Sequence, residues 1–509
     1  MGRFIFQLFF VFCSIGLVAQ QVQIVGVAKE YAGKKVVLFK NSDAVSRRRE
    51  VIEIKDINET GSFKFELSIK ETQCVTISIA RMDGALYIEP NHTYEITFPP
   101  SAVAESKRFD RTEIPLDFTK LPEDDLNILI RSFNADYIQF INDHYFDFVA
   151  DEFKGAEVYR STLGNKAQKS DIYKMPVADS DSTKNAALTD FPKAVASFMS
   201  AMEMKYSSRF DNLFFKDYVR YSLGEIKYLS GLSRKRFYQE YFHSQPVLYQ
   251  NPAYVKCFDL IYRNLFSKST SLQQETLSKI INGENDFQKL SAHFQNDSSV
   301  LDIDVRSLAL LINLKNSYYE KKFSKAAILK TIGKAAGALL NRDQNAAATN
   351  IVHELRQFEK GADSEDFILA DLKGEKWILS EHTGMPIYIF FFASWNVASI
   401  KELLLLQKLH SVYQHDVQII AINMDDDYEA YKKYIREHKD QKFTFLYGTG
   451  DPLLTEKYNV RSIPHAVMLD KEGKWVSTYT RKPSEGIEED FKKLKANGAK
   501  GTGTKTWRD

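Results

Sequence analysis

Hydrophobic and polar residues alternate through much of the first hundred residues of the chain. In the segment GSFKFEL, at 61–67, every second side chain is hydrophobic, and residues 74–79 and 94–98 repeat the pattern. A period of two is typical of a β-strand that buries one face. Clusters of turn-forming residues, such as NETG at 58–61, separate these runs. The pattern predicts a small antiparallel β-sandwich over 21–100.

From about residue 115 the hydrophobic spacing changes from two residues to three or four. The first such segment predicts a long helix with one apolar face, formed by Leu126, Ile130, Phe133, Tyr137, Ile141 and Phe148. Further helices are predicted near 191–230, 253–267, 301–319 and 324–340. A polar stretch at 161–190 is predicted to be a loop or a mobile insertion. Together these segments predict a helical domain over 115–355.

From Gly361 onward, predicted strands and helices alternate. The run MPIYIFFFAS at 385–394 is continuously apolar, which is typical of a central strand buried on both faces. Helices are predicted over 397–413, 427–438, 451–458 and about 485–496, with short apolar strands between them. This order predicts an α/β domain over 361–495 and a flexible tail at 496–509. The chain is therefore predicted to be multidomain α+β.

The N-terminus has the pattern of a secretory signal. Arg3 precedes an apolar run that begins at Phe4 and ends near Ala19. This run is shorter than the roughly 20 residues of a membrane span, and Ala19–Gln20 suits signal peptidase, which predicts a signal peptide at 1–19. The alternative is a retained membrane anchor. The bulky residue before Cys13 argues against a lipoprotein site, so we expect an exported protein of the periplasm or cell envelope.

Composition limits the classes of partner and the role of cysteine. The 68 basic and 67 acidic residues give a formal charge of +1, so composition does not suggest the clustered excess positive charge that nucleic-acid binding needs, and we expect no nucleic-acid partner. Cleavage would leave Cys74 and Cys257, far apart in the sequence. A disulfide between them and two buried free thiols are both open, and the free thiols are favoured.

Two segments resemble the thioredoxin-like family. FFASWNVASIKELLLL, at 391–406, is similar to the active-site strand and helix of that family. YNVRSIPHAVMLDKEGKW, at 458–475, is similar to its cis-proline segment, and the preceding GDPLLTE suits the exported TlpA-like branch. The resemblance runs from Gly361 to Leu494 and implies a thioredoxin-like fold. GSFKFEL and LYIEPNHTYEI also resemble the β domain often found ahead of such domains.

The same resemblance implies that the catalytic residues are missing. The family's two redox cysteines correspond here to Asn396 and Ser399, and no cysteine follows Cys257. A buried acid that many relatives keep is replaced by Phe390. Thiol–disulfide exchange needs an attacking thiolate and a resolving thiol, and neither an amide nor a hydroxyl can serve. We therefore predict no catalytic residue in this domain.

A binding groove could persist without the cysteines. The resemblance places Trp395, Asn396, Ile463, Pro464 and His465 around the groove in which relatives pair with an extended peptide. It also implies a cis Ile463–Pro464 bond. Asn396 is expected to cap the following helix. Pro464 either serves peptide binding or only shapes the turn, and His465 is either a titratable donor or a plain surface histidine.

No other motif in the sequence indicates a metal or a cofactor. The acidic run at 425–427 lacks the spacing of a calcium loop and is expected to be a solvated turn. The ten histidines form no HExxH pair, and no glycine-rich phosphate loop occurs. We therefore expect no cofactor and no metal.

Two functions fit these observations. The first is a redox-inactive binding or scaffold module of the bacterial envelope, whose partner is an envelope protein or peptide. The second is a thiol–disulfide oxidoreductase that uses a partner's thiol, in cell redox homeostasis or in the maturation of envelope proteins or cytochromes. The loss of the reaction's covalent participants favours the first, and enzyme activity is not expected. A catalytic site in the helical domain is a third, weaker idea that no constellation of residues supports.

Overall fold

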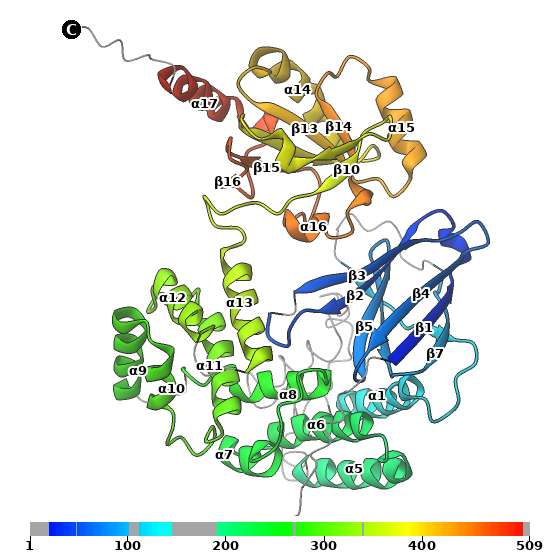
Figure 1. Ribbon diagram of the computed structural model, residues 1–509, viewed down its shortest axis with the longest axis vertical. Helices are drawn as coiled ribbons and strands as arrows, with labels where there is room; N and C mark the ends of the chain where they lie inside the picture. Colours follow the sequence, from blue (N-terminus) through cyan, green and yellow to red (C-terminus); the bar gives the residue numbers. More distant parts are fainter. Residues whose placement is uncertain are drawn as a thin grey trace, which may run out of the picture.

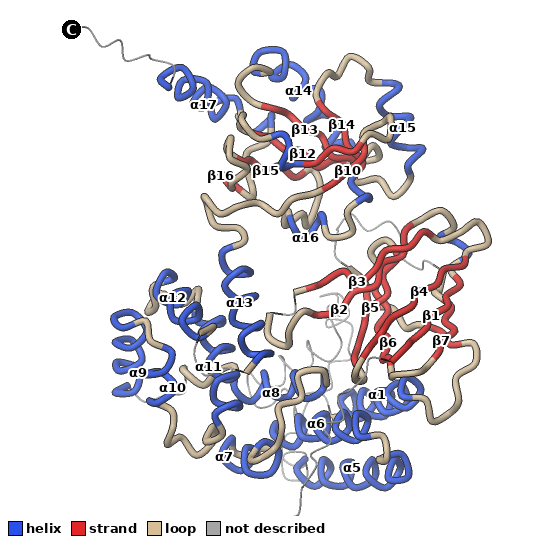
Figure 2. The backbone as a smooth tube through the Cα atoms, viewed as in Figure 1, coloured by secondary structure: helices blue, strands red, loops and turns tan. Residues whose placement is uncertain are grey.

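A computed structural model describes residues 20–46, 48–100, 111–144, 191–267, 271–337 and 341–501 (Figures 1 and 2). The predicted signal peptide at 1–19 and the predicted loop at 161–190 lie outside these ranges. Within them, no helix combines the length and the hydropathy that crossing a membrane would require.

The N-terminal β region consists of two sheets around a shared core. Their strands are β1 (Gln20–Val27), β2 (Lys35–Asn41), β3 (Arg49–Asp56), β4 (Ser62–Ile69), β5 (Gln73–Ile79), β6 (Met82–Ile88), β7 (Thr93–Thr97), β8 (Thr112–Glu113) and β9 (Asp117–Phe118). One sheet has the order β4-β1-β7-β9 and the other β3-β2-β5-β6-β8. The alternation seen in the sequence is real, since β4 buries Phe63, Phe65 and Leu67 and exposes the residues between them. Most strand pairs are antiparallel, but β1 with β7 and β6 with β8 are parallel.

Helices follow, packed through aromatic and aliphatic side chains. They include α1 (Leu126–Asp143), α5 (Phe191–Tyr206), α6 (Leu213–Leu229), α7 (Arg234–Phe237), α8 (Pro252–Tyr262), α9 (Ser271–Ser278), α10 (Phe287–His293), α11 (Ile303–Ser317), α12 (Lys325–Ala335) and α13 (Arg342–Arg356). The predicted helical segment at 191–230 is divided, because Asn212 caps a new helix by accepting a hydrogen bond from the Phe215 amide. Cys74 and Cys257 are both free thiols, of which Cys257 is buried and Cys74 is half-buried.

The C-terminal region is an α/β layer built on one mixed sheet. The sheet order is β11-β10-β14-β13-β12-β15-β16. Its strands are β10 (Ile368–Ala370), β11 (Lys376–Ile378), β12 (Ile387–Phe392), β13 (Gln418–Asn423), β14 (Thr444–Tyr447), β15 (His465–Leu469) and β16 (Trp475–Ser477). Its helices are α14 (Val397–Tyr413), α15 (Tyr428–Glu437), α16 (Leu454–Lys457) and α17 (Glu488–Gly501). The multidomain α+β class predicted from the sequence is confirmed.

The central strand β12 is buried on both faces, as its continuous apolar sequence predicts. Phe391 packs into the core on one side of the sheet, whereas Phe390 and Phe392 pack into the core on the other side. Phe390, at the position where the family resemblance places an acid, is a fully buried hydrophobic side chain. A flexible tail is predicted at 496–509, and α17 extends through Gly501.

Candidate functional site

The candidate site lies at one edge of the C-terminal sheet. Strands β12, β13 and β14 are parallel, so their carboxyl ends meet at the same edge. The loop after β12 carries Trp395 and Asn396. The segment before β15 comes to the same place, because the Asn396 Nδ2 donates a hydrogen bond to the Ile463 carbonyl at 3.4 Å. Residues 395–396 and 463–465, which the sequence analysis grouped, are thus brought together.

Asn396 is the N-cap of α14. Its side-chain oxygen accepts a hydrogen bond from the Ser399 backbone amide at 2.9 Å. Ser399 is fully buried, and its hydroxyl has no hydrogen-bond partner within the described ranges. The two positions where the family resemblance places cysteines therefore hold a capping amide and a buried hydroxyl. Neither side chain can form a disulfide.

The Ile463–Pro464 peptide bond is cis. The Ile463 side chain is only 8% exposed and belongs to the same core cluster as Tyr458 and Val460. The Ile463 side chain therefore supports the fold, and its carbonyl is bound by the Asn396 side chain. Arg461 and Ser462, which precede it, are the exposed residues of this segment.

His465 is neither the groove-edge donor nor the surface histidine that the sequence left open. It begins β15 and is 6% exposed, with its ring 5.9 Å from that of Phe391 and 5.7 Å from that of Tyr479. Burial lowers the pKa of His465 to about 4. The imidazole is consequently neutral at pH 7 and belongs to the packed interior of the domain.

The acidic run after β13 is only in part the solvated turn expected from the sequence. Asp425 is 2% exposed and accepts hydrogen bonds from the Ser394 amide at 3.0 and 3.2 Å, and from the Asn423 side chain at 2.9 Å. Asp426 and Asp427 are exposed, and Asp427 also caps α15. No cluster of metal-binding side chains occurs in the part of the chain that the structure describes. Because Asp425 stands in a run of three acidic residues, the sequence alone does not predict its structural role. Its position directly after a buried strand is the feature that could have indicated it.

An exposed apolar stripe extends from the site along α14. Leu403 and Leu406 face the core, whereas the outer face of the same helix carries apolar side chains together with the exposed Lys401 and Lys408. Five large apolar side chains are exposed here: Trp395, Val397, Leu404, Leu405 and Val412. We call this set the α14 stripe. Surface residues of this kind, gathered on one helix, are typical of an interaction surface.

The two thiols within the described ranges are remote from this edge in sequence, and the pKa of each is raised. Cys74 is in β5 and Cys257 is in α8. Burial raises the pKa of the Cys74 thiol to about 12 and that of the Cys257 thiol well above its ordinary value. Both groups are therefore protonated thiols at neutral pH, and the thiolate is the form that attacks a disulfide.

Known proteins resemble this region of the chain. A family model described as thioredoxin-like matches residues 384–475. The thiol-disulfide oxidoreductase ResA of Bacillus thuringiensis subsp. konkukian is 27% identical over 140 residues, covering 27% of this chain and 80% of the relative. ResA of Geobacillus kaustophilus is 28% identical over 150 residues, covering 29% of this chain and 84% of the relative.

Solved structures are also similar to part of the chain. The thioredoxin domain of a thiol-disulfide oxidoreductase from Bacteroides vulgatus is 22% identical with a TM-score of 0.25, covering 27% of this chain and 98% of that one. A thiol:disulfide interchange protein from Bacteroides sp. is 24% identical with a TM-score of 0.25, covering 29% of this chain and 97% of that one.

Proposed function

We propose that the thioredoxin-like C-terminal region of this chain is a redox-inactive binding module of an exported envelope protein. The observation that carries this proposal is that neither of the two positions where the family resemblance places a cysteine holds one. Asn396 caps α14 and Ser399 is buried beneath it. The helix start that would activate a thiolate is intact, but it carries no sulfur.

The retained surface supports a binding role. Trp395 is 46% exposed at the tip of the loop after β12, and the α14 stripe continues from it. The backbone around Ile463 lies beside it, held by Asn396. An extended polypeptide can pair with such a backbone as an added strand, while aromatic and aliphatic side chains supply apolar contact. The partner proposed is therefore an envelope protein or peptide.

The predicted signal peptide supports the proposed envelope location. The N-terminal pattern predicts a signal peptide at 1–19, and cleavage after Ala19 would start the mature chain at Gln20, the first residue of β1. Residues 361–495 are proposed to act as one folding unit, preceded by the β-sandwich and the helical domain.

A disulfide-reduction assay tests the loss of chemistry. We expect purified protein beginning at Gln20 to reduce insulin disulfides no faster than buffer with the same reductant. A variant with Cys74→Ser and Cys257→Ser controls for stray thiols. Activity that survives in this variant would overturn the proposal.

The second candidate is a thiol–disulfide oxidoreductase that borrows a partner's thiol. It is favoured by the relatives named as thiol-disulfide oxidoreductases. Under this alternative, adding a thiol-bearing envelope extract would restore insulin reduction, and Trp395→Ala would lower it. Under the binding proposal, Trp395→Ala weakens polypeptide binding and no reductase activity appears with or without extract.

A further inference from the structure

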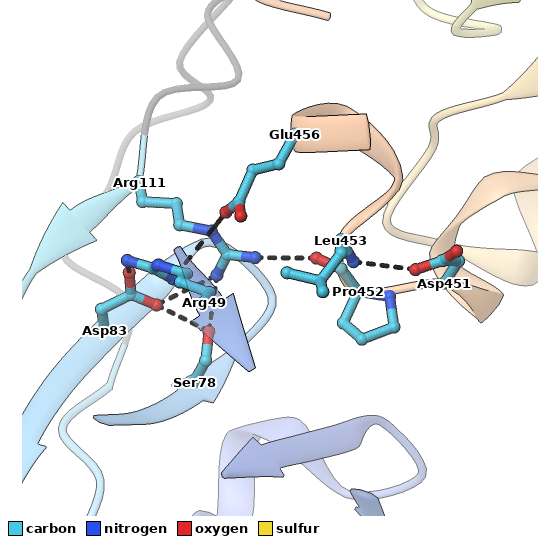
Figure 3. A network of polar contacts seen from close by, with 8 residues as sticks. All are labelled: Arg49, Ser78, Asp83, Arg111, Asp451, Pro452, Leu453 and Glu456. Atoms are coloured by element: carbon cyan, nitrogen blue, oxygen red, sulfur yellow. Dashed lines mark hydrogen bonds and ion pairs between the residues drawn. The ribbon is translucent and has the colours of Figure 1, made fainter. Parts of the chain in front are cut away.

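Arg111 joins the β region to the segment between β14 and the cis-proline (Figure 3). The Arg111 Nη2 donates a hydrogen bond to the Pro452 carbonyl at 2.8 Å, and its Nε donates to the Glu456 carboxylate at 2.9 Å. Pro452 and Glu456 belong to the segment between β14 and the cis-proline. Every nitrogen of this guanidinium is engaged, because its Nη1 binds inside the β region.

Asp83 holds the Arg111 guanidinium within the β region. Its side chain is only 5% exposed and accepts hydrogen bonds from Arg111 at 3.0 Å, Arg49 at 2.6 Å and Ser78 at 2.7 Å. Both guanidinium groups also lie 5.5 Å from the Phe39 ring. Planar guanidinium groups bind carboxylates in a fixed geometry. The buried Asp83 carboxylate therefore fixes the orientation of the Arg111 side chain.

A second contact reaches the other side of the same edge. Arg81, next to β6, pairs with Asp426 at 3.4 Å. Asp426 follows Asp425, whose carboxylate holds the Ser394 amide directly before Trp395. The β region therefore touches both loops that flank the candidate site.

The connection from Glu456 to the cis-proline is short and packed. The Val460 amide donates to the Thr455 carbonyl at 2.8 Å, closing the turn after α16. Tyr458 and Val460 are buried in the same core as Ile463. A segment fixed at both Pro452 and Val460 has little freedom to move Ile463 independently.

We propose that the β region positions the candidate binding edge, with Arg111 and Arg81 as the positioning residues for the cis-proline segment and for the loop carrying Trp395. This goes beyond the proposed function, because it concerns the order of the two loops and holds whether or not a polypeptide binds there. It assigns the N-terminal region a role in the C-terminal site.

Hydrogen exchange of the full mature chain tests the proposal. The double variant Glu456→Gln with Asp426→Asn removes the charge on the C-terminal side of both contacts and leaves the buried Asp83 pairs intact. We expect amides in 393–400 and 458–464 to exchange about threefold faster or more, since paired surface charges of this kind stabilise local structure by a fraction of a kcal/mol each. Glu437→Gln with Glu472→Gln, on the same region but away from these contacts, is the matched control and should leave both segments unchanged.

A charge exchange supplies the rescue. Arg81→Asp alone should loosen 393–400, and adding Asp426→Arg should restore the wild-type exchange rate by re-forming the pair in reverse. Unchanged exchange in Glu456→Gln with Asp426→Asn would overturn the positioning role. Equally faster exchange throughout 361–495 in that variant would also overturn it. The assay contains no peptide and measures no activity, so its outcome is independent of the proposed binding.

Discussion

The chemistry of the candidate site depends on two residues, Asn396 and Ser399. The side-chain oxygen of Asn396 accepts a hydrogen bond from the Ser399 backbone amide, so this side chain stabilises the start of α14. Ser399 lies with its hydroxyl fully buried, in the place of a resolving thiol. Neither side chain carries sulfur, and both residues lie at the start of a regular helix.

Introducing cysteines at positions 396 and 399 should create a redox-active pair. In Asn396→Cys with Ser399→Cys, the free amides at the α14 N-terminus favour a thiolate at position 396, so we expect its pKa to fall below the ordinary value of about 8.5. The rate of iodoacetamide alkylation against pH measures this. If the introduced thiol at position 396 titrates at or above that value, the helix start no longer favours an anion.

His465 should make stability depend on pH in a defined window. Its folded-state pKa of about 4 lies below its unfolded value of 6.5, so protonation is harder in the folded protein. The stabilisation from its neutral form is complete above pH 6.5 and is lost as the pH falls towards 4. In thermal unfolding at pH 7.5 and 4.5, we expect His465→Gln to lose less stability than the wild type, by on the order of 2 kcal/mol.

The comparison between these two proteins cancels the other titrating groups, which are the same in both. Parallel losses in the wild type and His465→Gln would show that the buried imidazole does not govern the acid response.

At the scale of the element, the sequence predicts whether a segment is a helix or a strand. It predicts less well which face of that element is exposed. The continuous apolar run of β12 and the helical span of α14 were both predicted, and the structure has them at Ile387–Phe392 and Val397–Tyr413. The α14 stripe could not be predicted, because apolar residues occupy both faces and periodicity alone does not choose between them. Likewise, Asp425 looked like its exposed neighbours because a charge run carries no information on burial.

Adjacent leucines on α14 should respond differently to truncation. Leu403 is fully buried, whereas Leu404 is 47% exposed. We expect Leu403→Ala to lower the free energy of unfolding by about 2–5 kcal/mol and Leu404→Ala to change it by less than about 0.5 kcal/mol. Urea unfolding monitored by circular dichroism measures both. Equal losses would mean that the outer face of α14 is covered in solution.

At the scale of the whole molecule, the regions join through polar contacts that link distant parts of the sequence. The turn between β2 and β3 meets α13, where the Asn350 side chain donates to Ser42 at 3.1 Å and to Asp43 at 2.8 Å. Lys315 of α11 donates to the Val45 carbonyl at 3.2 Å. Such contacts involve ordinary polar residues without a local pattern, so the sequence predicted the separate regions but not how they meet.

Asp43 should hold this turn against α13. Its carboxylate also accepts hydrogen bonds from the Val45 amide at 2.7 Å and the Ser46 amide at 2.6 Å. We expect Asp43→Ala to make the turn a few-fold more sensitive to limited proteolysis, because local opening becomes less costly. Asp56→Ala, at an exposed strand end, is the control. A cleavage rate equal to that of the control would contradict the role of Asp43.

The Asp83 anchor has a consequence for the order of folding during synthesis. Arg49, Ser78 and Arg111 all lie within the first 111 residues, so this charge network can close as soon as the β region has emerged. Glu456 is 345 positions beyond Arg111 and arrives last. N-terminal regions generally fold first as the chain grows, and contacts of such separation form slowly. We therefore expect the C-terminal region to make its contacts with Arg111 after the Asp83 network of the β region has already formed.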